Sequence, residues 1–276
     1  MVKKVLITGS SGYIGSHLTH LLKDEYEVHG LDINYPQVDP HTFYHCDINR
    51  QFNLEEEFDC VIHLAAKVNV GESEKMPIQY YITNLNGTMN VVNKIKTKNF
   101  IFASTGAAEG CASAYGISKR AAEDVVREYC TQHNKKDYSI FRFYNVIGST
   151  VVPPTNPDGL MLNLMKAVKT GEFTIFGNDY DTKDGTCVRD YVHVMEICDA
   201  LKTAIDKPSN SVEPLGHGVG KTVYEMTCMF QDINGCEFEV KYGPRRKGDL
   251  PSSVLEDVSP YMRNLYTINE LLKINA

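Results

Sequence analysis

The sequence predicts an α/β fold, a doubly wound parallel sheet of the Rossmann-like type with a second, smaller α/β lobe for the substrate. Three observations predict it. Short apolar, β-branched runs alternate with longer helix-like segments, a glycine-rich turn follows the first run, and the alternation loosens after about residue 150. We therefore expect a first domain over residues 1–150 and a smaller lobe over 151–276, with some interleaving of the two.

The predicted elements follow in order. Strands are expected over 5–8, 27–32, 42–47, 59–66, 99–104 and 138–143. Strands that alternate with helices indicate crossover units and a parallel sheet covered on both faces. Helices are expected over 13–24, 76–96 and 114–133. Beyond them, prolines and glycines cluster at 153–159, and charged loops separate short elements, as expected of a smaller lobe.

Composition excludes several classes of function. The 276 residues include 28 Lys and Arg against 35 Asp and Glu, so the net charge is −7, and no basic run offers a nucleic-acid or anionic-membrane surface. The first apolar run is too short for a signal peptide and none reaches membrane length, which predicts a soluble, cytoplasmic protein. Eight cysteines without a C-x-x-C pair predict reduced thiols, and nine scattered histidines predict no metal site.

A dinucleotide site is predicted by "LITGSSGYIGSHL", which places Gly9, Gly12 and Gly15 between a strand and a helix. Glycine there allows a tight turn and close backbone approach to a pyrophosphate at the helix N-terminus. Asp32 ends the next strand and can accept hydrogen bonds from a ribose, although a plain turn residue would also fit there. Because Asp32 repels a 2′-phosphate and "INYPQ" has no arginine, we expect NAD rather than NADP.

Two further strand ends belong to the same predicted site. Asp47 and Ile48 end the third strand, where an adenine ring could lie. The fourth strand ends in "HLAA", which supplies the small Ala65 and Ala66, although simple core packing would also explain them.

A catalytic group is predicted by "STGAAEGCASAYGISK". Thr105 follows the fifth strand, and Tyr115 and Lys119 are four residues apart, so they share one face of a helix. A neighbouring ammonium, a cationic nicotinamide and the helix N-terminus all favour the phenolate of Tyr115, and lowering its pKa by ~3 needs roughly 4 kcal/mol of such interaction. Tyr115 is then a base for an alcohol proton while the carbon gives up hydride, and Thr105 bonds the same oxygen. Cys111 has no nearby histidine in sequence to activate it as a nucleophile.

These motifs resemble the extended short-chain dehydrogenase/reductase family. Within it, "VGESEKMPIQYYITNLNGT", "IFGNDYDTKDGTCVRDYVHVME" and "PRRKGDLP" are similar to the UDP-glucose 4-epimerase family over nearly the whole chain. The resemblance implies an isomerase that holds NAD tightly, takes hydride from C4′ of a UDP-hexose, lets the 4-keto sugar turn over and returns hydride to its other face.

The resemblance also implies roles for individual residues. The cofactor would contact Gly9, Gly12, Tyr13, Ile14, Gly15, Asp32, Ile33, Asp47, Ile48, Leu64, Ala65, Ala66, Asn84, Tyr115, Lys119 and Tyr144. The UDP-sugar would contact Thr105, Tyr115, Asn145, Thr174, Ile175, Phe176, Arg189, Arg246, Asp249 and Ser253. Arg189 and Arg246 suit forked hydrogen bonds to a diphosphate, although surface salt bridges would be the simpler interpretation without the resemblance.

The sequence departs from the family pattern at several positions. Thr105 stands where serine is usual, Val68 aligns with a usual lysine, Glu109 replaces a tyrosine, and the loop from Thr105 to Tyr115 is short. Ser253 stands where many bacterial relatives have a tyrosine. A small residue there predicts acceptance of UDP-N-acetylglucosamine and UDP-N-acetylgalactosamine beside the UDP-hexoses.

Other functions remain as alternatives. A nucleotide-sugar dehydratase needs acids beside Thr105, but Gly106 and Ala107 follow it; a decarboxylase of the same family or a non-catalytic NAD-sensing module is also conceivable. A homodimer is expected by analogy, through the helices near 76–96 and 114–133.

Overall fold

The computed structural model describes residues 2–134, 136–246 and 248–274. The chain divides into two compact units. Unit 1 contains residues 1–143 and 198–213, and unit 2 contains residues 144–197 and 214–276. Among the described residues, no helix has both the length and the apolar character needed to cross a membrane.

Unit 1 contains a sheet with the strand order β10-β6-β5-β4-β1-β2-β3. Its strands are β1 (Lys4–Thr8), β2 (Glu27–Asp32), β3 (Thr42–His45), β4 (Glu57–His63), β5 (Lys96–Thr105), β6 (Asp137–Phe143) and β10 (Val212–Leu215). The pairings from β3 through β6 are all parallel. This order confirms the predicted doubly wound sheet, because the chain moves outward from β1 in both directions.

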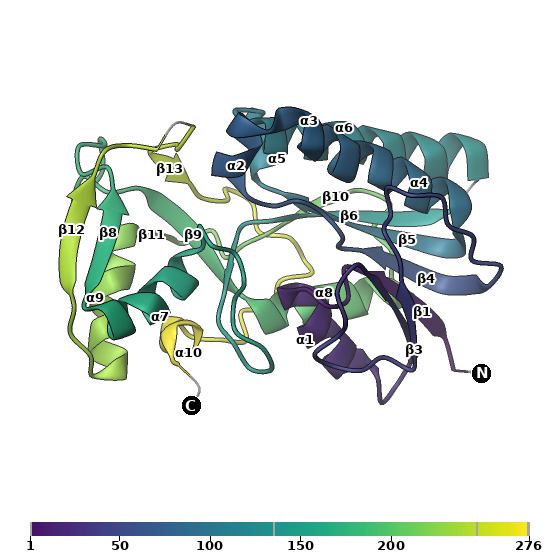
Figure 1. Ribbon diagram of the computed structural model, residues 1–276, viewed down its shortest axis with the longest axis horizontal. Helices are drawn as coiled ribbons and strands as arrows, with labels where there is room; N and C mark the ends of the chain where they lie inside the picture. The colour runs from purple at the N-terminus through teal and green to yellow at the C-terminus, as the bar shows by residue number, and fades with distance from the viewer. Residues whose placement is uncertain (1, 135, 247, 275–276) are drawn as a thin grey trace. The chain divides into compact units, whose positions relative to one another are not determined.

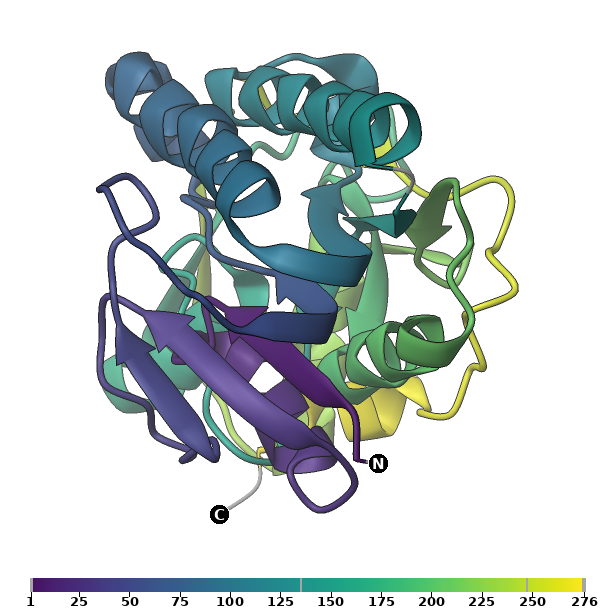
Figure 2. The ribbon, with the colours of Figure 1, turned by 90° about the vertical axis from the view of Figure 1, so that its right-hand side faces the viewer.

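Helices cover both faces of this sheet, as Figures 1 and 2 show. The helices α3, α4 and α6 lie on one face, and α1 and α8 on the other. Their bounds are α1 (Tyr13–Leu22), α2 (Val70–Lys75), α3 (Pro77–Tyr80), α4 (Gly87–Lys94), α5 (Ala107–Gly110), α6 (Ala114–Glu128) and α8 (Val194–Asp206). The core between the sheet and α4 and α6 includes Phe58, Phe100, Phe102 and Val126, which are completely buried.

The structure corrects several predicted boundaries. The expected helix over 76–96 is three segments, because a π-helical stretch η1 (Tyr81–Asn86) separates α3 from α4. A second one, η2 (Tyr129–Asn134), follows α6. The third strand ends at His45 and not at Asp47, because the Asp47 carboxylate accepts from the Asn49 amide nitrogen at 2.9 Å and closes a turn there. The fourth strand ends at His63, before "LAA".

Unit 2 has its own core. In one sheet β11 (Gly220–Thr222), β9 (Val188–His193) and β13 (Ser252–Ser253) lie in that order, and β7 (Asn145–Ile147) also pairs with β9. A second, parallel pair consists of β8 (Glu172–Phe176) and β12 (Glu239–Gly243). The helices are α7 (Leu160–Thr170), α9 (Val223–Asn234) and α10 (Ile268–Leu272). Apolar side chains of these elements, including Leu164, Met226 and Phe230, form the core.

Candidate nucleotide and catalytic site

The glycine-rich turn between β1 and α1 has no room for side chains. Gly9 has a φ of +76°, and a Cβ on it would lie 2.7 Å from the amide nitrogen of Ala65. A Cβ on Gly15 would lie 2.1 Å from the Gly9 carbonyl oxygen, which itself accepts from the Gly12 amide at 3.1 Å. Only glycine therefore allows β1, the loop after β4 and the start of α1 to approach this closely.

The N-terminus of α1 suits a bound phosphate. Its N-cap residue is Gly12, which offers no side chain to accept from the first-turn amides of residues such as Tyr13 and Ile14. A phosphate of a dinucleotide can take the place of a capping side chain there, where the helix dipole also favours negative charge. The cradle around Gly9 and Gly15 thus fits the pyrophosphate of NAD.

Asp32 holds the glycine-rich turn. Its carboxylate accepts from the Ser11 amide at 3.0 Å and from the Asn34 amide at 2.9 Å. The hydroxyl of Ser11 donates to the Asn34 carbonyl at 2.7 Å, which ties the two loops a second time. Ile33 is exposed beside Asp32. The carboxylate keeps lone pairs for a ribose, so the same residue can order the loop and bind a nucleoside.

In the predicted adenosine region, not every side chain is free to contact a ligand. Ile48 is only 5% exposed, and its side chain packs against Gly87 of α4 within the core. Its carbonyl oxygen accepts from the Asn90 side-chain amide at 2.9 Å. A contact of Ile48 with adenine would therefore need its backbone. Leu64, Ala65 and Ala66 form the loop after β4 that passes beside Gly9.

Thr105, Tyr115 and Lys119 come together in unit 1. Thr105 is the last residue of β5, and its hydroxyl oxygen accepts from the Ala107 amide at 3.2 Å. Ser113 caps α6, since its hydroxyl oxygen accepts from the Gly116 amide at 3.1 Å. This cap starts the helix so that Tyr115 and Lys119 turn inward, where both are more than nine-tenths buried, and Thr105 lies close enough to the phenol to lower its pKa in part.

The pKa of Tyr115 corrects the sequence-based expectation for the chain by itself. Burial raises the pKa of Tyr115 to about 12, although the hydrogen bond with Thr105 lowers it in part. Burial lowers the pKa of Lys119 to about 7, and the charge of Glu123 raises it in part. Desolvation opposes the charged form of both groups, so the protein alone keeps the phenol protonated. A lower pKa needs a further positive charge in the site.

Lys119 lies in an unusual environment for an amine. Its Nζ is 4.1 Å from the centre of the Phe102 ring, a cation–π geometry. Its charge also acts on His63, whose pKa falls to about 3, mainly through burial. The two ring nitrogens of His63 lie 2.6 Å from the Thr8 hydroxyl and 2.9 Å from the Thr88 hydroxyl. His63 is thus a neutral residue at the end of β4 whose hydrogen bonds link β1 to α4.

Sequence reasoning missed His63 and a second buried residue, Glu123. Glu123 is four residues beyond Lys119 and eight beyond Tyr115, so the spacing already indicated a third member of the same helix face. It bonds Ser104 and Arg142 from β5 and β6. His63 had no such local signal, because its partners lie on β1 and α4.

Asn84 does not present a free side chain. It is completely buried in η1, and its amide bonds the main chain of Lys67 and the hydroxyl of Ser118. Lys67, beside Val68 in the loop after β4, pairs with Glu72 at 3.2 Å. Asn84 therefore acts on the site through that loop rather than by direct contact through its amide.

The residues assigned to the nucleotide of the substrate lie in unit 2. Arg189 is largely buried on β9; its Nη1 donates to the carbonyl oxygen of Leu250 at 2.8 Å, and its Nη2 lies 3.5 Å from the Asp249 carboxylate. These contacts hold one edge of the guanidinium. A fixed, planar guanidinium suits a diphosphate.

A stacked pair offers a surface for a flat ring. The guanidinium of Arg246 lies 4.1 Å from the centre of the Phe176 ring, and Phe176 is partly exposed at the end of β8. In the same strand Ile175 is buried in the core, so Thr174 and the main chain remain for polar contacts. Asn145 on β7 donates to the Asp190 carbonyl at 3.2 Å, and Tyr144 precedes it.

Ser253 is the register partner of Arg189, because β13 pairs in parallel with β9. It is half-buried. Paired residues of neighbouring strands place their side chains on the same face of a sheet, so the small hydroxymethyl group of Ser253 accompanies the arginine.

Comparisons with known proteins identify the family of the chain. Residues 5–217 match the model of the NAD dependent epimerase/dehydratase family. A curated relative, UDP-glucose 4-epimerase of Bacillus subtilis, is 32% identical over 293 residues, covering 89% of this chain and 86% of its own.

Two solved structures have similar folds. The UDP-glucose 4-epimerase of Bifidobacterium longum in complex with NAD+ and UDP has a TM-score of 0.84 and 27% identity, covering 98% of this chain and 96% of its own. The UDP-Glc/GlcNAc 4-epimerase of Campylobacter jejuni has a TM-score of 0.75 and 26% identity, covering 98% of both chains. With its glycine cradle, its paired Thr105 and Tyr115 and a family match over most of its length, the chain belongs to the NAD dependent epimerase/dehydratase family.

Proposed function

We propose that the chain catalyses the NAD-dependent 4-epimerisation of UDP-hexoses, interconverting UDP-glucose and UDP-galactose. The placement of Tyr115 and Lys119, both buried on one face of α6 in the same unit as Thr105 and the nucleotide cradle, is the observation that carries the proposal. Tyr115 and Thr105 present two hydroxyls that can contact one substrate oxygen. The names of the curated relatives and the NAD+ and UDP in the Bifidobacterium longum structure agree with it.

The residues of unit 1 would hold and then move one proton. NAD+, when bound, supplies a hydride acceptor and a positive charge. Tyr115, ionised beside that charge, takes the proton of the 4′-hydroxyl, and Thr105 donates to the same oxygen. Lys119, buried one helical turn from Tyr115, would limit the cost of the phenolate when it is charged. When hydride returns to the other face of the sugar, Tyr115 gives the proton back, so no net oxidation occurs.

The residues of unit 2 would hold the nucleotide while the sugar turns. Arg189, braced by Leu250 and Asp249, offers its remaining donors to the diphosphate. The Phe176 ring, with Arg246 stacked on it, suits the flat face of uracil. A grip that involves only the nucleotide leaves the hexose free to present either face, which inversion at C4′ requires.

A wider substrate range follows from Ser253. Its small side chain leaves room for an N-acetyl group at C2 of the sugar, so we propose that UDP-N-acetylglucosamine and UDP-N-acetylgalactosamine are also substrates. Ser253→Tyr should remove the activity on both N-acetylated sugars and spare UDP-galactose. Equal loss with all four sugars would refute this.

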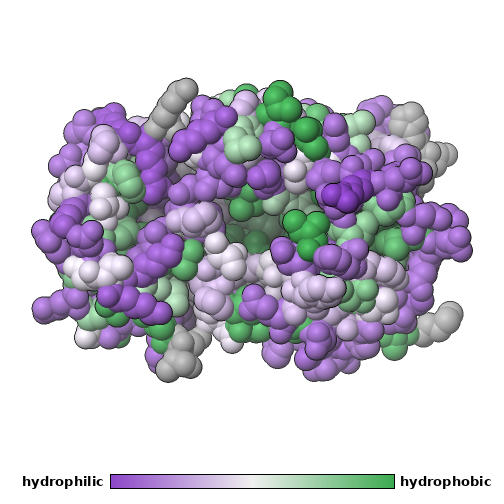
Figure 3. Space-filling model, viewed as in Figure 1, coloured by the Kyte–Doolittle hydropathy of each residue, from purple (hydrophilic) through white to green (hydrophobic). Residues whose placement is uncertain are grey.

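A homodimer is part of the proposal. Ile78, Ile82, Met89 and Ile117, on α3, η1, α4 and α6, are between 38% and 66% exposed. Figure 3 shows apolar surface over the α3 helix, within a mostly hydrophilic face. Such side chains on adjacent helices suit a helix-to-helix contact between two copies. Sedimentation should show a dimer, and Ile78→Glu should dissociate it.

The experiment that tests the activity is direct. The purified protein is incubated with NAD+ and UDP-galactose, and the product sugar is separated by anion exchange. We expect UDP-glucose, and a loss of about 100-fold or more in rate for Tyr115→Phe. Absence of any 4-epimer, with NAD+ bound, would contradict the proposal and favour an NAD-sensing module.

A further inference from the structure

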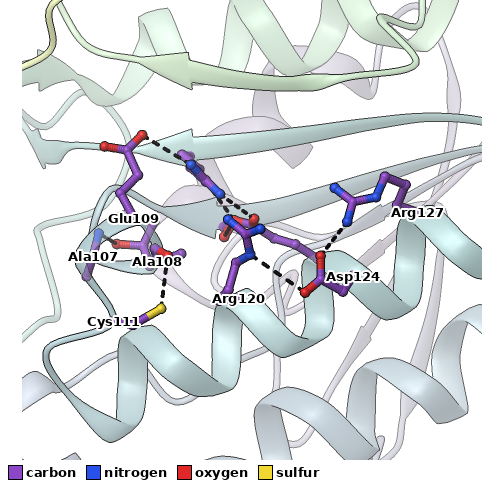
Figure 4. Close-up of polar contacts among 11 residues, drawn as sticks. Ala107, Ala108, Glu109, Cys111, Arg120, Asp124 and Arg127 are labelled. Atoms are coloured by element: carbon purple, nitrogen blue, oxygen red, sulfur yellow. Dashed lines mark hydrogen bonds and ion pairs between the residues drawn. The ribbon is translucent and has the colours of Figure 1, made fainter.

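A charge network joins α5, α6 and β6 close in sequence to the catalytic residues of unit 1, with two of its three members largely buried. The guanidinium of Arg142, on β6, contacts two carboxylates from different elements. Its Nε and Nη2 donate to Glu123 of α6 at 2.9 and 2.7 Å, and its Nη1 donates to Glu109 of α5 at 3.2 Å. Figure 4 shows Glu109 in the short segment that precedes α6, with a dashed line to one of its carboxylate oxygens.

The inner half of the network joins the catalytic helix to the sheet. Glu123 is 1% exposed, and its Oε1 also accepts from the Ser104 hydroxyl at 2.5 Å. Ser104 is the register partner of Arg142 and immediately precedes Thr105. Glu123 shares its helix face with Lys119 and Tyr115. The same carboxylate is therefore bonded to the strand that ends in Thr105 and lies on the helix that carries the phenol.

The outer half joins the short loop to the same guanidinium. Glu109 is about half exposed and lies in α5, between Thr105 and Tyr115. The backbone of Ala107, two residues earlier, donates to the Thr105 hydroxyl. A Cβ on Gly116 would lie only 2.4 Å from the Ala107 carbonyl oxygen, so α5 rests directly on the first turn of α6. A shift of α5 would thus move Thr105 and the segment beside Tyr115.

We propose that Glu109 is a positioning residue, which uses Arg142 to lock the loop between Thr105 and Tyr115 against the buried Glu123 and so sets the distance between the two hydroxyls. This rests on the proposed function. Glu109 does not touch the reacting atoms. Glu109 forms its ion pair with a guanidinium that Glu123 already immobilises. The entropic cost of ordering the arginine, which weakens most surface ion pairs, is therefore absent here.

The obvious variant, Arg142→Ala, leaves the buried Glu123 without its cation and would unfold unit 1. The test therefore uses Glu109→Ala, which keeps the pair of Arg142 with Glu123. The matched control is Asp124→Ala. Asp124 lies on the exposed face of α6, next to Glu123, and pairs with Arg120 and Arg127 at 3.6 and 2.5 Å. Figure 4 shows the contacts of Asp124 with Arg120 and Arg127 along α6.

Two readouts decide the inference. With UDP-galactose as substrate, Glu109→Ala should lower kcat by about tenfold with KM within twofold, because misplacement of a catalytic group affects chemistry more than binding. Glu109→Gln, which can still accept from Arg142, should recover most of this loss. Amide hydrogen exchange over residues 105–114 should be faster in Glu109→Ala and unchanged in Asp124→Ala.

Unchanged exchange in the loop of Glu109→Ala, or a kcat equal to that of Asp124→Ala, would overturn the inference. A parent protein without 4-epimerase activity would instead contradict the proposed function. The exchange measurement would still decide whether Glu109 orders the loop, so the two failures are distinguishable.

Discussion

The side chain of Asn84 forms hydrogen bonds with both main-chain polar groups of Lys67. Its Oδ1 accepts from the Lys67 amide at 2.8 Å, and its Nδ2 donates to the Lys67 carbonyl at 3.0 Å. Both bonds belong to one residue of the loop after β4, so a single amide holds that loop as a neighbouring strand would. The π-helical turn η1 lets Asn84 point inward, and such turns are frequent at functional sites.

Asn84→Ala should therefore destabilise the protein and weaken NAD binding. It leaves the Lys67 amide and carbonyl and the Ser118 hydroxyl without this partner, which should lower the free energy of unfolding by about 3 kcal/mol. Urea unfolding measures the loss. Asn90→Ala removes one bond, to the Ile48 carbonyl, and should cost about 1 kcal/mol. Equal costs for the two variants would contradict this role of Asn84.

Gly15→Ala should abolish the retention of NAD. The new methyl would lie 2.1 Å from the Gly9 carbonyl oxygen and 2.8 Å from the Ser10 Cα, both main-chain atoms that cannot rotate away. The start of α1 must then shift, at a cost of about 2 kcal/mol or more. The bound cofactor is measured after denaturation of the purified protein. Gly110→Ala is the control, because nothing lies within 4 Å of its added Cβ.

The phenol of Tyr115 should titrate differently with and without cofactor. In the chain alone burial raises its pKa to about 12, above the usual value of 10, so the phenolate signal near 295 nm should appear only in strong alkali. NAD+ brings a positive charge beside the ring and should shift the titration to lower pH. The signal is the difference between parent and Tyr115→Phe. If the titration curve is unchanged by NAD+, the result would contradict the proposed role of Tyr115 as the base.

The stability of unit 2 should depend on pH through His217. Its Nε2 lies 2.8 Å from the Glu196 carboxylate, which raises the pKa of His217 above 6.5 despite burial. Burial would raise the pKa of Glu196, but hydrogen bonds from His217 and from the main chain of His193 and Leu265 lower it overall.

A raised histidine pKa stabilises the fold below the unfolded value of 6.5 and loses this effect as pH rises through the folded value. A lowered glutamate pKa stabilises above 4.5 and loses the effect as pH falls. The ion pair thus contributes most between about pH 5 and 6.5. His217→Gln should lower the unfolding free energy more at pH 6 than at pH 9, as measured by urea denaturation, whereas exposed His20→Gln should not change this dependence. A loss independent of pH would exclude the ion pair.

Much of unit 1 could be predicted because its signals are local. The strands β1 to β6 contain short apolar, β-branched or aromatic runs that alternate with helical segments, and the glycine spacing fixes the turn at α1. Tyr115 and Lys119 share a helix face because four residues make about one turn. The end of the third strand was misplaced because the Asp47 carboxylate closes a turn just after His45.

The rest of the site depends on residues far apart in the chain. Ile48 looked like a contact for adenine, but Gly87 of α4 leaves a place for its side chain in the core. From the sequence, Glu109 was only the residue that replaces the tyrosine usual in the family. The structure instead pairs it with Arg142 on β6, a strand that begins 27 residues after α5 ends at Gly110 (137 − 110 = 27).

The sequence by itself determined the doubly wound sheet, the glycine cradle and the shared face of Tyr115 and Lys119, because backbone conformation and helical phase are set within a few neighbouring residues. Only the tertiary structure decided that Tyr115 is held protonated in the chain alone, that Asn84 bonds a loop, and that Arg142 joins Glu109 to Glu123. Desolvation and charge pairing depend on which distant atoms replace water around a group, and packing alone determines those atoms.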